Sequence, residues 1–184
     1  MRITGLSCMV AMSAKHVILI VLIALLSPFV PINTKLILEK YVALFNPSRE
    51  EVRQFFCTTW QKHTDGSLLT PLEMLASQWM ELHPEFHMIL NDPTGALEQE
   101  FTPEKGITNP FLHLSMHLSI SEQISIDQPP GIRQIANALS KKLDSEHEAQ
   151  HQIMECLGQV LWQAQRDASA LDTNTYLESL RKLL

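Results

Sequence analysis

Histidines at helical spacing are the residues in this chain best suited to do chemistry. Seven histidines follow residue 45, and six of them form i, i+4 pairs: His83/His87, His113/His117 and His147/His151. Random placement would give only about 0.3 such pairs, so the pattern needs a cause. Two imidazoles one helical turn apart lie on the same face of a helix and can bind one transition-metal ion.

Two of the three pairs lie in segments with strong helical signals, whereas Pro84 interrupts any helix that would join His83 to His87. Glu155 extends the third pair by one more turn. The ligand set that we predict is therefore His113, His117, His147, His151 and Glu155, with Glu155 as a ligand or a general base. Imidazole and carboxylate together suit Zn, Fe or Mn rather than Ca or Mg. The pattern indicates no catalytic residue and no other cofactor, and it leaves open whether the protein is an enzyme.

A second interpretation needs no metal. The four histidines of the two stronger pairs could form a hydrogen-bonded network in the core, with partners such as Ser115, Gln123 and Glu148. Each buried ring nitrogen left without a partner would cost about 1–3 kcal/mol, so such a network must be nearly complete. The protein would then be a non-catalytic interaction or scaffold module.

The helices that must position these residues are marked by their caps. Asn109 and Pro110 open a helix that runs to about Gln123 and is apolar on all sides, which is typical of a buried helix. Two capping boxes, Ser48-x-x-Glu51 and Thr70-x-x-Glu73, open earlier helices. Further helices are expected at about 131–143, 145–166 and 172–183, and a short one at 84–90, with a loop at 94–108 that has room for one helical turn. We predict an all-α fold, a single bundle-like domain of five or six short helices over residues 45–184, with Trp60, Trp79 and Trp162 in its core.

The composition of the chain limits the kinds of molecule that the protein is expected to bind. The chain has 184 residues and a formal charge of −6; residues 1–45 carry +3, so the remainder carries −9. An acidic body without a Lys/Arg cluster argues against nucleic-acid binding. Three widely spaced cysteines, Cys8, Cys57 and Cys156, form no disulfide framework and fit a reducing cytoplasm. No partner is indicated, and a homo-oligomer stays open.

The first 44 residues form an apolar extension with three interpretations. The run Val17–Leu26 has the length of a signal peptide but no small-residue cleavage site follows it. A membrane anchor over residues 17–30 is weakened by Pro28 and Pro31. In the third interpretation, which we favour, Leu44 corresponds to a TTG start codon, and residues 1–44 are not part of the native, cytoplasmic protein.

Five motifs together are similar to a known family. They are FNPSREE (45–51), HPEFH (83–87), TNPFLHLSMHLSISEQ (108–123), DQPPGIR (127–133) and MECLGQVLWQAQR (154–166). Over about residues 45–184 the chain resembles the short bacterial proteins grouped as domain of unknown function 1841, which typically begin near the equivalent of Phe45. The resemblance implies their fold and a bacterial, cytoplasmic home. It implies no activity and no substrate.

Overall fold

The protein is built from helices joined by short turns. The structure, a computed structural model, describes residues 47–101 and 108–184. In these ranges there is no strand, and the backbone forms eight α-helices and one short 3-10 helix: α3 (Arg49–Thr64), α4 (Pro71–Glu81), η3 (Pro84–Phe86), α5 (His87–Leu90), α6 (Pro93–Glu98), α7 (Pro110–Ile126), α8 (Ile132–Leu143), α9 (Glu146–Arg166) and α10 (Thr173–Arg181). The all-α class is confirmed, and the predicted number of helices, five or six, is too low.

The additional helical segments, η3, α5 and α6, are short, and η3 and α6 each begin at a proline. Pro84 and Pro93 each occupy the first turn of a short helix, where the missing N–H of proline costs no hydrogen bond. The side chain of Asp92 caps α6 by accepting a hydrogen bond from the Gly95 N–H. Part of the expected loop at 94–108 is therefore helical, and residues 102–107 lie outside the described part of the chain.

The long helices begin where their capping residues predict. Ser48 and Thr70 each form a complete capping box, with Glu51 and Glu73 respectively as the reciprocal acceptors. At the start of α7, the Asn109 side chain accepts hydrogen bonds from the N–H groups of Phe111 and Leu112. These caps satisfy N–H groups that have no partner within the helix.

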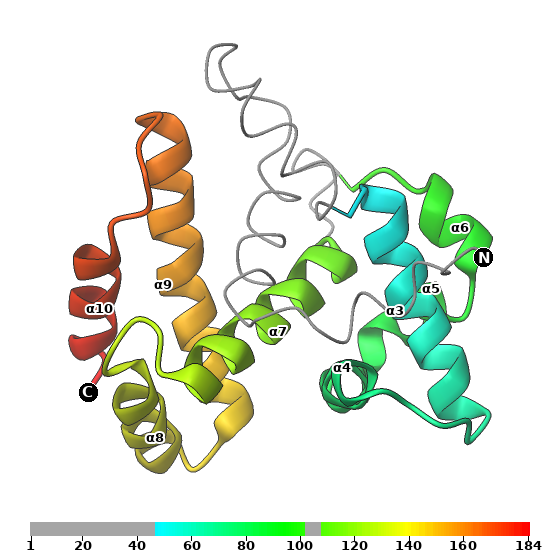
Figure 1. Cartoon of the computed structure of the whole chain (residues 1–184), viewed down its shortest axis with the longest axis horizontal. Helices are drawn as coiled ribbons and strands as arrows, with labels where there is room; N and C mark the ends of the chain where they lie inside the picture. Colours follow the sequence, from blue (N-terminus) through cyan, green and yellow to red (C-terminus); the bar gives the residue numbers. More distant parts are fainter. Residues whose placement is uncertain (1–46, 102–107) are drawn as a thin grey trace, which may run out of the picture. The chain divides into compact units, whose positions relative to one another are not determined.

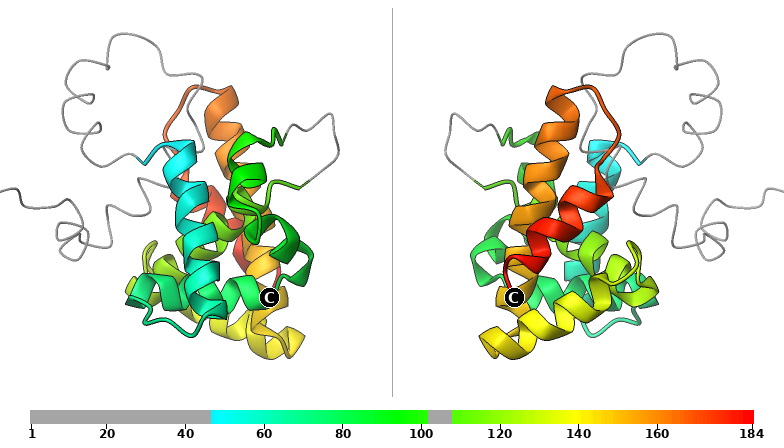
Figure 2. Two further views of the ribbon diagram at one scale, coloured as in Figure 1. Left: turned by 90° about the vertical axis from the view of Figure 1, so that its right-hand side faces the viewer. Right: turned by 90° about the vertical axis from the view of Figure 1, so that its left-hand side faces the viewer.

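Two hydrophobic cores share helix α7. The first core joins α3–α6 to the N-terminal part of α7, and it includes Phe56, Trp60, Trp79, Phe111 and Leu114. The second core joins the C-terminal part of α7 to α8, α9 and α10, and it includes Ile120, Leu139, Ile153 and Tyr176. Figures 1 and 2 show α7 between these two groups of helices. A helix that serves two cores needs apolar residues on several faces, which explains its all-round hydrophobicity.

One predicted core residue is at the surface. Trp60 and Trp79 are buried, but Trp162 is 60% exposed near the end of α9. The guanidinium of Arg166 lies 4.8 Å from the centre of the Trp162 ring, one turn further along the helix. The last turns of α9 extend beyond the packed part of the second core, so this tryptophan contacts a cation instead of apolar neighbours.

Two tight turns bring α9 back against α7. After α7, Asp127 adopts a left-handed conformation (φ 52°), and its carboxylate accepts hydrogen bonds from the N–H groups of Gly131 and Arg133. After α8, Asp144 is also left-handed (φ 51°), and the Ser145 side chain caps α9. The first turns of α9 then pack beside the middle of α7, where the side chains of Gln150 and His117 meet.

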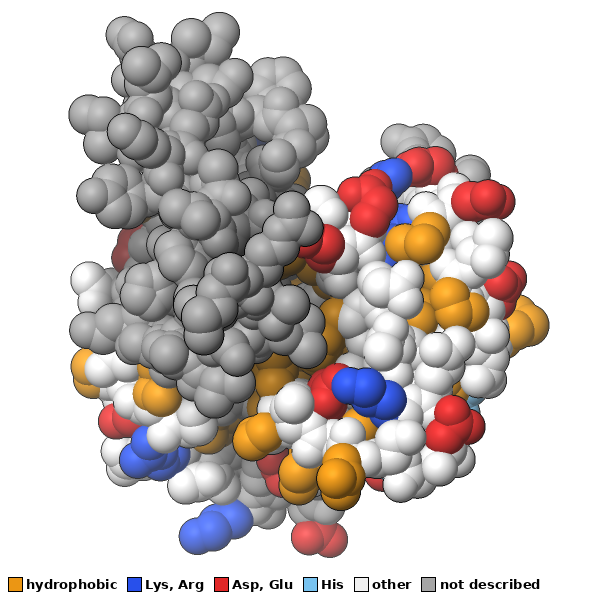
Figure 3. All heavy atoms as spheres, turned by 45° about the vertical axis from the view of Figure 1, so that its right-hand side comes forward, with side chains coloured by type: hydrophobic (Ala, Val, Ile, Leu, Met, Phe, Trp, Pro, Cys, Tyr) orange, Lys and Arg blue, Asp and Glu red, His pale blue; other side chains and the backbone are white. Residues whose placement is uncertain are grey.

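The N-terminal extension, residues 1–44, and its three interpretations lie outside the described residues. Within the ranges 47–101 and 108–184, no helix is both long enough and apolar enough to cross a membrane. On the face drawn in Figure 3, the described Lys and Arg side chains are spread over the surface and do not merge into one patch. The absence of nucleic-acid binding stays a prediction.

Candidate metal centre

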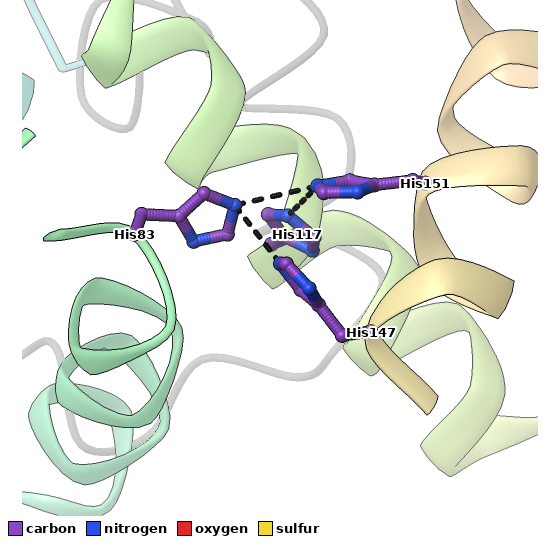
Figure 4. A group of neighbouring side chains, drawn as sticks. All are labelled: His83, His117, His147 and His151. Carbon is purple, nitrogen blue, oxygen red and sulfur yellow. Dashed lines mark hydrogen bonds between the residues drawn. The ribbon is translucent and has the colours of Figure 1, made fainter. Parts of the chain in front are cut away.

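Five histidines from three separate segments lie close together, and four of them, all except His113, have ligand atoms that converge as one group. His83 follows the C-cap of α4, His113 and His117 lie on the middle of α7, and His147 and His151 lie on the first turns of α9. Figure 4 shows the rings of His83, His117, His147 and His151 turned toward one another from these segments. One ligand atom from each of these four residues lies within 4.8 Å of the others.

The Nε2 atoms are close together across the whole group. Nε2 of His83 lies 2.9 Å from that of His113, 3.2 Å from that of His147 and 3.3 Å from that of His151. Nε2 of His113 is 3.2 Å from those of both His117 and His151, which are 3.3 Å from each other. Each of the five nitrogens therefore has at least one neighbouring nitrogen at 2.9–3.3 Å.

The other ring nitrogen fixes the tautomer of two of these histidines. The Nδ1–H of His83 donates to the carbonyl oxygen of Trp79 at 2.6 Å. The Nδ1–H of His117 donates to Oε1 of Gln150 at 3.0 Å. Because both acceptors are oxygens without a proton, Nδ1 must carry the proton in the neutral ring. Nε2 of both rings then presents a bare lone pair to the centre of the group.

Trp79, Gln150 and Ser121 together hold the His117 ring in place. The indole of Trp79 stacks on the His117 ring at 4.3 Å with an interplanar angle of 10°. Ser121 Oγ accepts hydrogen bonds from Trp79 Nε1 and from Gln150 Nε2, so the Gln150 amide is fixed with its oxygen toward His117. Partners of this kind, which fix the orientation of a ring and its tautomer, are a regular feature of metal-binding histidines.

Burial favours the neutral form of four of these imidazoles, those of His83, His113, His117 and His151. His83 and His117 are completely buried, and the other three are half-buried. Burial, reinforced by the neighbouring imidazoles, lowers the pKa of His113 to about 4. Burial likewise lowers the pKa of His117 to about 3, against the opposing effect of the Gln150 hydrogen bond. The pKa values of His83 and His151 are also lowered, again chiefly by burial. Neutral imidazole is the form that binds a metal.

Hydrogen bonds among the rings cannot account for this arrangement. An imidazole nitrogen has either one proton or one lone pair, and either of them points in a single direction in the plane of the ring. Five nitrogens can therefore form at most two good hydrogen-bonded pairs, yet six Nε2–Nε2 distances fall between 2.9 and 3.3 Å. A cation at the centre would accept every lone pair at once. For ligand bonds of about 2.1 Å, neighbouring nitrogens are about 3.0–3.4 Å apart, which matches the separations found.

The structure brings together all four histidines predicted to be ligands and adds a fifth. His83 was missed because Pro84 does end the helix; the break releases His83 from α4 and turns its ring toward α7. Its sequence partner His87 points elsewhere, donating from Nε2 to the Met80 carbonyl oxygen at 2.8 Å and stacking on Trp60. In the sequence, the pairing of His83 with His87 was the only indication that His83 could be a ligand. In the structure, the two rings face different neighbours.

Glu155 lies apart from the group. Its side chain is exposed on α9, one turn beyond His151, and it is not among the residues whose ligand atoms converge. Successive i, i+4 positions on a helix are rotated by about 40°, so a third member of such a series drifts off the face that the first two share.

Comparisons with known proteins identify a family. No curated protein and no solved structure matches this chain. The family model described as Domain of unknown function (DUF1841) matches residues 48–182. This range includes all five histidines of the site and every described helix. The chain therefore belongs to the DUF1841 family, as the resemblance of its motifs implied.

Proposed function

We propose that this protein binds one transition-metal ion through Nε2 of His83, His113, His117, His147 and His151. The observation that carries the proposal is the spacing of the five Nε2 atoms, each of which lies 2.9–3.3 Å from at least one other. This spacing suits ligands of one ion, and the close contacts are more numerous than hydrogen bonds among the rings can satisfy. The hydrogen bonds from Nδ1–H of His83 to the Trp79 carbonyl oxygen and from Nδ1–H of His117 to Gln150 support the proposal, because they turn the Nε2 lone pairs inward.

The all-nitrogen ligand set narrows the choice of metal. Imidazole suits Fe, Zn, Ni and Cu, while Ca and Mg require oxygen ligands. Five ligands exceed the four that Zn usually takes in structural sites, so iron or another metal of higher coordination number is favoured. A bound ion of this kind would act as a Lewis acid or a redox centre at the point where the two cores meet.

The histidine-network alternative is less well supported. Without an ion, the five Nε2 atoms form at most two hydrogen-bonded pairs, so at least one of them has no partner among the five. Such an arrangement costs about 1–3 kcal/mol for each unpaired buried group, with no gain to offset it. A metal removes this cost, so the same contacts favour the metal interpretation over a scaffold that lacks one.

Metal analysis of the protein purified without a histidine tag tests the proposal. We expect about one equivalent of a transition metal, with His83→Ala losing most of it and His87→Ala retaining it. These two variants are matched, because both remove a histidine from the same short segment and only one faces the site. Wild-type protein that holds no metal and takes up none on incubation with Fe(II), Zn(II) or Mn(II) would refute the proposal.

A further inference from the structure

The ligand set has no negative charge. In the described part of the chain, the ligand atoms that converge belong to histidines alone, without Asp, Glu or Cys. The carboxylates that influence these rings electrostatically, Glu85 and Glu148, are both exposed, as is Glu155. Exposed carboxylates are screened by water and compensate a buried charge only weakly.

A divalent ion at this point would bring two positive charges into a largely buried setting. His83 is 1% exposed and His117 is fully buried, and Trp79 and Phe86 stack against these two rings. Placing a net charge in such surroundings is costly unless a counter-charge is close by. Since the neighbouring side chains supply none at the ligand distance, an exogenous anion beside the ion would lower this cost.

The number of nitrogen ligands also leaves room for one more ligand. Five imidazoles exceed a tetrahedral set and fit either a five-coordinate arrangement or an octahedral one, which has six positions about 3.0 Å apart for bonds of about 2.1 Å. The Nε2 separations of 2.9–3.3 Å are compatible with the octahedral arrangement. In that arrangement, one position is left for a ligand that the chain does not provide.

Access to the site comes from one side. His113, His147 and His151 are half-buried, whereas His83 and His117 are closed off by the first core. In Figure 4, His147 and His151 extend from α9 on the side opposite His83.

We propose that the metal centre binds a small inorganic anion, of the size of hydroxide, superoxide or azide, as its sixth ligand. The inference rests on the proposed metal binding and adds the chemical class of the exogenous ligand. The anion neutralises part of the charge that the five imidazoles leave uncompensated, and it enters between α7 and α9.

Azide titration of the cobalt-substituted protein tests this. The tag-free protein is loaded with one equivalent of Co(II), and sodium azide is added at constant ionic strength while the visible absorption of the cobalt is recorded. We expect a saturable change that corresponds to one azide per cobalt. In proton NMR spectra, five exchangeable imidazole N–H signals shifted by the cobalt are expected before and after azide, because no histidine is displaced.

The outcomes separate this inference from the proposed function. Cobalt uptake followed by an unchanged spectrum in a large excess of azide overturns the anion site and leaves metal binding intact. A fall from five to four shifted N–H signals also overturns it, because azide would then be replacing a histidine. Failure to bind cobalt at all refutes the proposed function itself, and the anion site with it.

A charge variant provides an independent measurement. Glu148→Gln removes a negative charge near His151 without altering a ligand, so we expect azide to bind a few-fold more tightly at low salt and the difference to shrink as salt is added. Glu178→Gln on α10 is the matched control and should leave azide affinity unchanged. Equal azide affinity in Glu148→Gln and the control would contradict the electrostatic basis of the proposal.

Discussion

At the scale of single residues, the least replaceable side chains are those that accept a hydrogen bond from Nδ1 of an imidazole and so orient its Nε2 atom. Gln150 is buried, and its amide connects His117 to Ser121 and, through Ser121, to Trp79. Without the Gln150 oxygen, the His117 ring has no acceptor for Nδ1–H, so it can turn or move its proton to Nε2. The lone pair on which metal binding depends is then lost for part of the time.

Gln150→Leu, which keeps the volume of the side chain, should weaken metal binding by about 10- to 100-fold. Competition with a chelator of known affinity measures the change. Gln159→Leu is the control, since Gln159 is exposed on the same helix and should leave the affinity as it is. Equal affinities in the two variants would show that Gln150 has no part in orienting His117.

A second residue, Glu122, makes folding depend on pH. It lies on α7, and its Oε2 atom is buried without a hydrogen-bond partner in the described structure. Burial raises the pKa of this carboxyl to about 7 from an ordinary value of 4.5. The folded protein therefore prefers the protonated acid, so the contribution of Glu122 to stability is complete below about pH 4.5 and is lost as pH rises toward 7.

Glu122→Gln mimics the protonated acid and should remove this dependence. We expect the variant to match the wild type near pH 4 and to be more stable at pH 8, because glutamine pays no cost of ionisation. Urea unfolding at several pH values gives the difference in the free energy of unfolding between the two proteins. A difference that does not grow between pH 4.5 and pH 7 would contradict a raised pKa for Glu122.

At the scale of elements, the turns around α8 decide whether α9 reaches the site. Gly131 precedes α8 with φ 97°, a conformation that residues with a Cβ adopt only under strain, although a Cβ at this position would meet no atom within 4 Å. In contrast, Gly158 lies inside α9, and a Cβ there would have ordinary contact with Met116 at 4.0 Å.

The two glycines should respond to alanine with opposite signs. Gly131→Ala should lower the free energy of unfolding by about 1–2 kcal/mol through backbone strain, while Gly158→Ala should raise it by about 0.5–1 kcal/mol because alanine favours the helix. Chemical denaturation of both variants with the metal removed measures the effects free of metal binding. Stabilisation by Gly131→Ala would mean that this turn is not held in the left-handed conformation.

At the scale of the whole domain, the candidate metal site lies where the two hydrophobic cores meet. His83 comes from the segment packed in the first core, His147 and His151 come from a helix of the second core, and α7 belongs to both. An ion bound to all of them would add a direct link between elements of the two cores. Since the site needs the folded arrangement, binding free energy adds to folding stability.

Removal of the metal should therefore lower the melting temperature of the whole domain. With metal at a hundredfold excess over Kd, the stabilisation is about 2.7 kcal/mol, which corresponds to roughly 10 °C for a domain of this size. Differential scanning calorimetry with and without a chelator measures it. His83→Ala should show the lower melting temperature under both conditions, whereas a wild-type melting temperature that is unchanged by chelation would argue against a link between the cores.

Local sequence features predicted the long helices and the two histidine pairs within α7 and α9. Helix caps such as Ser48, Thr70 and Asn109 act on N–H groups only a few residues away, and the spacing of His113/His117 and His147/His151 follows from the pitch of one helix. Features set by such local geometry can be predicted from neighbouring residues. For the same reason, the four histidines of these pairs could be selected from the sequence, and their rings lie close together in the structure.

Which helix faces meet depends on the packing of the whole domain and could not be predicted from local sequence. His83 joins the site because the chain leaves α4 at a proline and crosses to α7, and this path depends on how the first core packs. Glu155 stays exposed because α9 contacts α7 only over its first turns. Long-range packing sums many weak apolar contacts between residues far apart in the chain, so no local pattern reports it. The histidine pairs indicated that a site was present, and the packing of α4, α7 and α9 determined its five members.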